Sequence, residues 1–293
     1  MPEGTIIKAL SGFYYVKSGE GVMQCRARGV FRKKKITPLV GDHAIYEVEP
    51  GSDGYIVTIG KRRNVLSRPP IANVDQAVLI FSVAEPDFDG VLLDRFLVHM
   101  EASHVPPLIC LTKDDLNAGD KRRMLVKRMI YYETIGYPVY WTSSQRHEGI
   151  HALSDHLKGR ISVFAGQSGV GKSSLLNVLN DQLHIDTQTI SQALGRGKHT
   201  TRHVELLQAG GGWVADTPGF SSLDFSGIDQ TVLEQCFPDF SNLRNACRFR
   251  GCLHMAEPGC AVKAAVEHGD VDHERYMHYC AFHEEIGRQK KVY

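Results

Sequence analysis

The chain has 293 residues, more than one domain usually contains, so two or three compact units are expected. A formal net charge of +1 excludes binding of nucleic acid through overall charge and leaves local basic clusters as the alternative. The N-terminus lacks an apolar stretch of secretory length and no run approaches a membrane span, so we expect a soluble, cytoplasmic protein without membrane contact. Seven cysteines, an odd number, argue against a disulfide framework.

Short β-type runs separated by Gly, Pro, Ser and Asp mark the first part of the chain, at residues 12–16, 22–28, 43–48 and 54–59. Strands this closely spaced predict a small barrel or sandwich. Basic and aromatic residues are interleaved there, namely Arg26, Arg28, Arg32, Lys33, Lys34 and Lys35 with Phe13, Tyr14, Tyr15 and Phe31. This composition is compatible with an RNA-binding surface, and the alternative is a solvated loop beside an aromatic core. The pair Pro69-Pro70 interrupts regular structure, which places a boundary near residue 68.

A parallel α/β unit follows this boundary. Residues 76–83 and 107–111 are apolar runs, and residues 91–102 between them have helical spacing. Directly after the second run comes Thr112-Lys113-Asp114-Asp115, which fits the pattern [NT]-K-x-D. At the carboxyl end of a parallel strand, Asp115 can accept hydrogen bonds from N1–H and the exocyclic amine of guanine, a pair that adenine does not offer. The tetrapeptide therefore indicates a guanine site if the chain binds a nucleotide.

A second base-proximal segment is expected further along. Residues 121–135 predict a helix and residues 137–141 a strand, and Thr142-Ser143-Ser144 follows it. The hydroxyl and amide groups of Ser143 and Ser144 can support the base from behind. The triplet is uninformative on its own and gains meaning only beside the other motifs.

The strongest signal is a phosphate-binding loop. Residues 161–176 predict a buried strand, a glycine-rich turn and the start of a helix, and they contain the complete pattern G-x-x-x-x-G-K-[ST]. The predicted nucleotide-binding residues of this loop are Gly166, Gln167, Ser168, Gly169, Val170, Gly171, Lys172, Ser173 and Ser174. The glycines let backbone N–H groups turn inward, Lys172 reaches the β/γ-phosphates, and Ser173 can ligate Mg²⁺.

Two short motifs after this loop complete a switch apparatus. The polar stretch at residues 195–202 includes His199, Thr200 and Thr201 and is typical of a switch loop, in which a threonine hydroxyl, assigned here to Thr201, completes Mg²⁺ coordination. A strand predicted at residues 212–215 ends in Asp216-Thr217-Pro218-Gly219, of the form D-x-x-G. Asp216 suits a water-mediated contact with Mg²⁺, and the Gly219 N–H suits the γ-phosphate.

The C-terminal part carries the pattern C-x4-C-x-H-x5-C, formed by Cys247, Cys252, His254 and Cys260. Three thiolates and one imidazole complete a tetrahedral Zn²⁺ shell and leave no position for water, so the site is predicted to be structural. The alternative is three buried reduced cysteines and an unrelated histidine. Residues 262–267 and 274–286 are expected to be helical.

The order of the motifs is unusual, because TKDD and TSS precede the phosphate loop where ordinary GTPases place them last. This circular permutation, with TKDD at 112, TSS at 142, GQSGVGKSS at 166, HTT at 199 and DTPG at 216, resembles the bacterial small-ribosomal-subunit-dependent GTPases of the RsgA or YjeQ family. The resemblance implies a multidomain α/β protein with three units: an oligonucleotide-binding β-barrel at residues 1–68, a permuted GTPase domain at 69–227 and a mainly helical zinc module at 228–293. It also implies a late maturation factor of the small ribosomal subunit that contacts its rRNA and hydrolyses GTP to GDP when the subunit stimulates it.

The residue that positions the attacking water is not the usual one. Ordinary GTPases place a glutamine just after D-x-x-G, whereas this chain has Phe220-Ser221, so slow intrinsic hydrolysis is expected and His199 is the candidate in the chain. Two other functions remain open from the residues: a non-catalytic RNA-binding scaffold gated by nucleotide, and a P-loop ATPase or small-molecule kinase. A monomer is the default expectation.

Overall fold

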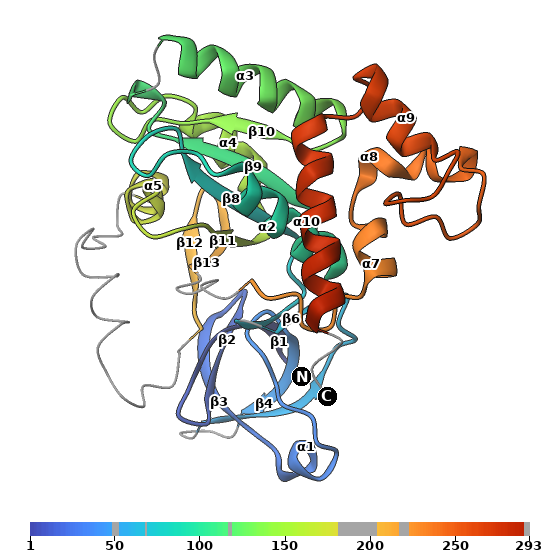
Figure 1. Ribbon diagram of the computed structural model, residues 1–293. Helices are drawn as coiled ribbons and strands as arrows, with labels where there is room; N and C mark the ends of the chain where they lie inside the picture. The colour runs from blue at the N-terminus through green and yellow to red at the C-terminus, as the bar shows by residue number, and fades with distance from the viewer. Residues whose placement is uncertain (49–52, 68, 117–118, 181–203, 217–222, 290–293) are drawn as a thin grey trace.

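The computed structural model describes residues 1–293 with the exception of 49–52, 68, 117–118, 181–203, 217–222 and 290–293. It contains an N-terminal β-barrel, a central sheet with helices on its two faces, and a C-terminal group of helices beside that sheet (Figure 1). The predicted site residues His199, Thr200, Thr201 and Gly219 lie outside the described residues. Among the described helices, none combines the length and the apolar character that a membrane crossing requires.

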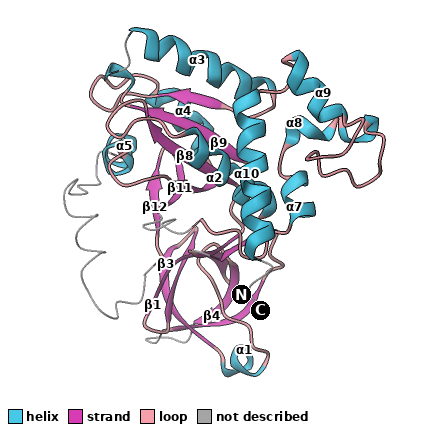
Figure 2. Ribbon diagram, in the orientation of Figure 1, coloured by secondary structure: helices cyan, strands magenta, loops and turns pink. Residues whose placement is uncertain are grey.

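The N-terminal unit is a closed barrel with the strand order β1-β2-β3-β5-β4 (Figure 2). Its strands are β1 (Glu3–Leu10), β2 (Phe13–Ser18), β3 (Gly21–Ala27), β4 (His43–Val48) and β5 (Gly54–Ile59), and the short helix α1 (Gly29–Lys33) lies between β3 and β4. β1 pairs with β4 and so closes the barrel. The expectation of a small barrel is confirmed, but β1 was not among the predicted strands. Its register shifts between Ile6 and Lys8, and such an irregularity breaks the alternation by which a strand is recognised.

A two-stranded ribbon follows the barrel where the paired prolines predicted an irregular linker. It consists of β6 (Val65–Ser67) and β7 (Pro70–Ala72), with Pro70 at the first position of its strand, where a missing N–H is tolerated. The Ala72 N–H donates to the Val40 carbonyl at 2.9 Å. Arg62 binds the fully buried Asp42 carboxylate through two hydrogen bonds of 2.7 and 2.8 Å. These contacts fasten this part of the chain to the barrel.

The central sheet has six strands in the order β10-β9-β8-β11-β13-β12. They are β8 (Gln76–Ser82), β9 (Pro107–Thr112), β10 (Val139–Trp141), β11 (Ile161–Ala165), β12 (Leu206–Ala209) and β13 (Gly212–Asp216). β12 runs antiparallel to β13, and the other pairs are parallel. The strands expected at 76–83, 107–111, 137–141 and 161 onward are present, with small shifts at their ends.

Helices cover both faces of this sheet, as strand alternation requires. On one face Leu79 and Phe81 pack with α2 (Gly90–Ala102) and α3 (Gly119–Thr134). On the other face Val78 and Ile80 pack with α4 (Ile150–Leu157) and α5 (Lys172–Leu179). Successive residues of β8 thus enter opposite cores, and its seven positions are all buried. The result is a sheet covered by helices on both faces, which confirms the expected α/β character of this domain.

The C-terminal helices form a separate apolar core against the outer side of α2. They are α7 (Gln230–Gln235), α8 (Pro238–Ser241), the 3-10 turn η2 (Arg244–Ala246), α9 (Ala261–His268) and α10 (His273–Gln289). Val98 of α2 belongs to this core, with Phe237, Phe240 and Phe282. α10 runs alongside α2 in Figure 1, and contacts between the two helices join the module to the sheet domain. The predicted mainly helical character is confirmed.

Candidate functional site

The predicted site segments meet at one edge of the central sheet. Parallel strands end on the same side, and the segments beginning at Thr112, Thr142 and Gly166 come at or directly after the ends of β9, β10 and β11. Starting from β8, the chain adds β9 and then β10 on one side of the sheet, and it then returns to the other side of β8 to form β11. Ligands of open parallel sheets bind at the carboxyl edge beside such a reversal.

The glycine-rich loop turns tightly against the neighbouring strand. A Cβ atom on Gly166 would lie 2.1 Å from the Ile80 carbonyl oxygen of β8, and Gly166 has φ +156°. Only glycine fits there. α5 begins after Gly171, which has no side-chain cap, so its first N–H groups are directed toward the loop. The Lys172 ammonium donates to the carbonyls of Gly166 at 2.9 Å and Gln167 at 2.6 Å.

Thr112 fastens this loop to β9. Its side chain is buried, and its hydroxyl lies within hydrogen-bond distance of the Val170 carbonyl in the loop and of the Phe81 carbonyl of β8, the latter at 3.1 Å. One hydroxyl hydrogen serves one of these acceptors at a time. Thr112 was predicted as a nucleotide contact, and the structure shows its hydroxyl engaged with backbone carbonyls of two segments.

Asp115 is oriented by a serine from the next loop. The Ser143 hydroxyl donates to Asp115 Oδ1 at 2.5 Å and accepts from the Arg146 N–H at 3.1 Å. Ser143 is fully buried, and its backbone pairs with that of Glu148 in both directions. The structure therefore brings together Asp115 and Ser143, two residues that the sequence separates by one helix and one strand. Among the described residues no donor contacts the second oxygen of the half-buried carboxylate, so this oxygen can accept from a ligand.

The neighbours of Asp115 have other contacts. Lys113, at φ +59°, donates from its ammonium to the Glu85 carbonyl, and Asp114 forms an ion pair with Arg122 at 3.1 Å. Ser144 is half-buried beside Ser143. Within the loop after β11, Ser168 and Gly169 are exposed, while Ser173 and Ser174 are half-buried in the first turn of α5. Asp216 is the last residue of β13, paired in register with Phe164 of β11.

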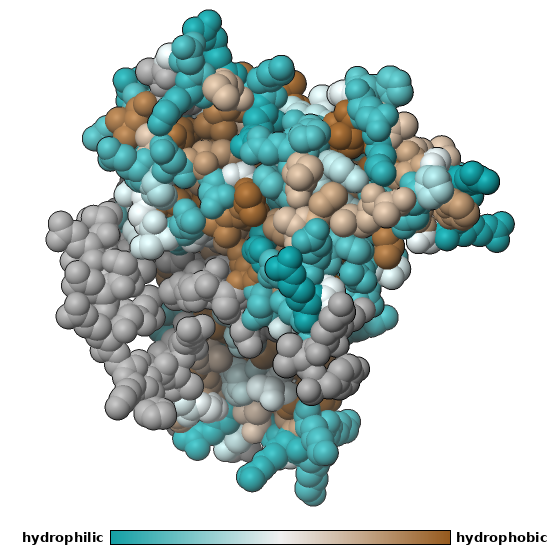
Figure 3. Space-filling view, in the orientation of Figure 1, coloured by the Kyte–Doolittle hydropathy of each residue, from teal (hydrophilic) through white to brown (hydrophobic). Residues whose placement is uncertain are grey.

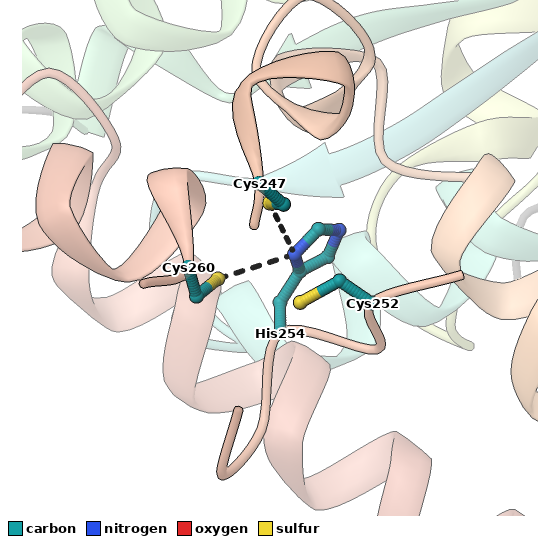
Figure 4. A group of neighbouring side chains, drawn as sticks. All are labelled: Cys247, Cys252, His254 and Cys260. Atoms are coloured by element: carbon teal, nitrogen blue, oxygen red, sulfur yellow. Dashed lines mark hydrogen bonds between the residues drawn. The ribbon is translucent and has the colours of Figure 1, made fainter. Parts of the chain in front are cut away.

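The predicted metal ligands form a compact cluster in the C-terminal module. The ligand atoms of Cys247, Cys252, His254 and Cys260 all lie within 4.8 Å of one another. Bonds of about 2.3 Å in a tetrahedron place sulfur atoms about 3.8 Å apart, so the cluster fits Zn²⁺. Figure 4 shows the imidazole between two of the sulfurs, with Nδ1 3.6 Å from Cys247 Sγ and 3.3 Å from Cys260 Sγ. Burial raises the pKa of the Cys252 thiol to about 12, and a bound metal ion would favour its thiolate.

Groups around the cluster hold its members in place. The other imidazole nitrogen, His254 Nε2, lies 3.3 Å from a carboxylate oxygen of Glu234 on α7, which also pairs with Arg244 at 3.3 Å. A carboxylate there fixes the ring so that Nδ1 faces the sulfurs. Backbone N–H groups donate to the Cys247 sulfur from Ala261 at 3.4 Å and to the Cys260 sulfur from Lys263 at 3.5 Å. Glu234 was not predicted, because it precedes the first cysteine and belongs to no spacing pattern.

Comparison with known proteins decides the family. The profile described as RsgA GTPase matches residues 59–226, and the profile described as RsgA N-terminal domain matches residues 3–56. The chain belongs to the RsgA GTPase family. Membership implies GTP hydrolysis, with Mg²⁺ accompanying the nucleotide. The expectation from motif order is thereby confirmed.

Relatives of the RsgA family match over the full length. A protein of Shouchella clausii and one of Geobacillus kaustophilus, both named small ribosomal subunit biogenesis GTPase RsgA, are 55% and 54% identical, with complete coverage of both chains. The crystal structure of YloQ, described as a circularly permuted GTPase, has 48% identity and a TM-score of 0.84, covering 100% of this chain and 97% of its own. That of YjeQ from Thermotoga maritima has 34% identity and a TM-score of 0.86, covering 97% and 98%. The description of YloQ as circularly permuted agrees with the motif order of this chain.

Proposed function

We propose that this protein is a GTPase that binds the small ribosomal subunit through its rRNA, assists late maturation of the subunit, and hydrolyses GTP to GDP and phosphate when the subunit stimulates it. The names and full-length identity of its relatives support the subunit as partner. The observation that carries the nucleotide assignment is the pairing of Asp115 with Ser143 at the sheet edge that also holds the loop of Lys172. An oriented carboxylate and a phosphate-binding loop at one edge select a guanine nucleotide.

The proposed contacts follow the motifs. One Asp115 oxygen accepts from Ser143, and the free positions of the carboxylate accept N1–H and the exocyclic amine of guanine. Lys113 lies along the base and sugar, and Ser144 supports the base from the neighbouring loop. The backbone N–H groups of the phosphate loop and the Lys172 ammonium surround the phosphates. The assigned loop contacts are Gly166, Gln167, Ser168, Gly169, Val170, Gly171, Lys172, Ser173 and Ser174.

Hydrolysis consists of in-line attack by water on the γ-phosphorus, with cleavage of the bond to the β–γ bridging oxygen and release of GDP and phosphate. Ser173 and Thr201 would hold Mg²⁺, which neutralises charge on the phosphate oxygens, with Asp216 acting through water. The Gly219 N–H would donate to the γ-phosphate, and Thr200 would lie beside it. Because Phe220 stands where a glutamine normally positions the water, we assign this task to His199.

The flanking modules are proposed to serve the RNA partner. The metal cluster would hold one structural Zn²⁺ with no open coordination position, because four protein ligands already complete the tetrahedron. The proposed units are residues 1–68, 69–227 and 228–293, and their separate apolar cores support the division between the last two. The protein is proposed to act as a cytoplasmic monomer.

The test is steady-state phosphate release from GTP and from ATP, each with and without purified small ribosomal subunits. A low rate with GTP that the subunit raises many-fold, together with no comparable rate with ATP, is the expected result. Equal use of both nucleotides would favour a P-loop ATPase or kinase. GTP-dependent binding to the subunit without faster phosphate release would favour a nucleotide-gated scaffold.

A further inference from the structure

The metal cluster presents a short, tightly held loop. Two of the three cluster cysteines, Cys247 and Cys252, lie at the two ends of this loop (Figure 4). Only four residues lie between them, and Gly251 turns the chain at φ +70°. The Arg248 N–H donates to the Gly259 carbonyl at 3.0 Å, which ties the loop to the segment before Cys260. We call residues 248–251 the RFRG loop. Anchors at both ends give it little freedom to rearrange.

The RFRG loop exposes an aromatic ring that the module does not need for its core. Phe249 is 44% exposed, whereas Phe237, Phe240 and Phe282 of the same module are at most 1% exposed. It is the only exposed phenylalanine among those that the structure describes. Burial of a ring of this size against a partner would recover free energy that its exposure to water costs, so the anchored ring is available for stacking.

The charge around the ring is positive. The Arg248 guanidinium lies 5.5 Å from the centre of the Phe249 ring, and Arg250 is exposed on its other side in sequence. Neither arginine has a carboxylate partner in the described part of the chain, whereas Arg244 pairs with Glu234. Residues 244–260 contain three arginines and a single acidic residue, Glu257, whose carboxylate accepts from two backbone N–H groups at 2.9 Å. The charged side chains next to the Phe249 ring are therefore guanidinium groups and not carboxylates.

We infer that the RFRG loop is a stacking site for an unpaired RNA base, with Phe249 as the platform and Arg248 and Arg250 as contacts to the adjoining phosphates. An aromatic face accepts any base, and neighbouring guanidinium groups supply charge and a second stacking plane. The inference rests on the proposed function, which gives the chain an RNA partner, and it names a contact surface that no motif of the nucleotide site includes.

The position of the loop suits this role. The segment between α8 and α9 projects to the right in Figure 1, apart from the barrel at the bottom, and this projection carries both hydrophilic and apolar residues in the space-filling view of Figure 3. A base-stacking site there lies apart from the barrel face, so one RNA would be held at two separated points. Anchoring by the metal ligands keeps the ring in place before RNA arrives, which lowers the ordering cost of binding.

The experiment measures binding of the full chain to protein-free small-subunit rRNA and to intact subunits at one fixed salt concentration. F249A is expected to weaken rRNA binding about tenfold, in the range found for loss of one stacked base. F249W should bind as well as the natural chain, and its added indole fluorescence should fall when RNA binds. R250A should lower the dependence of log affinity on log salt by about one, while R250K keeps it.

Controls separate this site from the fold and from the proposed function. M124A removes an apolar side chain that is 74% exposed on α3, outside the zinc module, and should leave rRNA affinity unchanged. Metal content and Tm of F249A should equal those of the natural chain. The inference is overturned if F249A binds rRNA like the natural chain, if the loss occurs with subunits but not with protein-free rRNA, or if the natural chain does not bind rRNA. Stimulation of GTP hydrolysis by the subunit, measured on the natural chain, tests the proposed function independently.

Discussion

Arg95 of α2 forms two hydrogen bonds to the Glu285 carboxylate of α10, at 2.9 and 2.6 Å. The same guanidinium donates to the Leu223 carbonyl at 3.0 Å and lies 4.5 Å from the centre of the Phe225 ring. Leu223 is the first described residue after the D-x-x-G segment. Arg95, on a helix that covers the sheet, therefore contacts both the chain just after the D-x-x-G segment and the last helix of the zinc module.

The contacts of Arg95 should couple the nucleotide state of the GTPase domain to the C-terminal module. R95Q is expected to reduce subunit stimulation of GTP hydrolysis several-fold while GTP affinity stays the same, because the contacts of Arg95 with described residues are at Leu223, Phe225, Phe282 and Glu285 and not at the sheet edge that binds the nucleotide. The partly exposed pair itself should contribute about 1 kcal/mol in a double-mutant cycle with E285Q. Stimulation that R95Q leaves intact would mean that the module does not sense the D-x-x-G segment through this contact.

The base site gives a prediction about selectivity. D115N is expected to lose GTP affinity by at least about 100-fold and to gain preference for xanthosine triphosphate, because an amide can donate to the carbonyl that replaces the guanine amine. S143A should weaken GTP binding about tenfold without changing base preference, since it removes one hydrogen bond to Asp115 and leaves the carboxylate in place. Titration of both variants with GDP and xanthosine diphosphate measures this. Equal weakening of both nucleotides by D115N would exclude guanine recognition by Asp115.

Local patterns predicted the sheet, the phosphate loop and the metal ligands, because each depends on residues close together in sequence. Gly166 and Lys172 are examples, as are Cys252 and His254. Contacts between distant segments could not be predicted in this way. Glu234 meets His254 across 20 residues and Arg95 meets Glu285 across 190, and no spacing rule connects either pair. The irregular register of β1 hid a strand for a different reason, since a bulge interrupts alternation.

The metal cluster can be tested through its carboxylate neighbour. E234A is expected to weaken metal affinity about 10- to 100-fold, because the His254 ring loses the group that orients it. C252A removes a ligand, so it should lower both metal content and Tm more strongly. Competition with a chromogenic chelator measures the affinities, and E267A on α9 is a matched control away from the cluster. Unchanged metal content and Tm in C252A would show that the cluster is not a structural metal site.

A buried arginine holds the zinc module against the sheet domain. Arg275 of α10 is 2% exposed and pairs with Asp94 of α2, which is fully buried, and with Asp239 of α8 at 3.1 Å. R275M is expected to lower the free energy of unfolding by about 3–5 kcal/mol, because two carboxylates lose their cation in a buried setting. R288M is the control, since Arg288 on the same helix is 81% exposed and its pair with Glu284 should contribute less than about 1 kcal/mol. Urea unfolding curves compare the two, and similar losses would contradict the assigned role of Arg275.

His99 should make the stability of this interface depend on pH. Its ring stacks on the Phe225 ring with 5.6 Å between the ring centres. Burial lowers the pKa of His99 below its ordinary value of 6.5, and Arg95 lowers it further. The hydrogen bond to the Leu223 backbone and the charges of Asp224 and Glu285 oppose this shift without cancelling it. A histidine whose pKa is lower in the folded protein than in the unfolded chain stabilises the fold. This contribution is complete at pH values above the pKa of the unfolded chain, and it is lost as the pH falls through the pKa of the folded protein. The free energy of unfolding should therefore decrease from pH 7.5 toward about 5.5, by at most about 1.4 kcal/mol per pH unit for this proton. H99F retains the stacked ring and should flatten the profile, although His156 and His283, whose pKa values burial also lowers, leave a residual slope. Parallel profiles for H99F and the natural chain would assign the pH dependence to those two histidines instead.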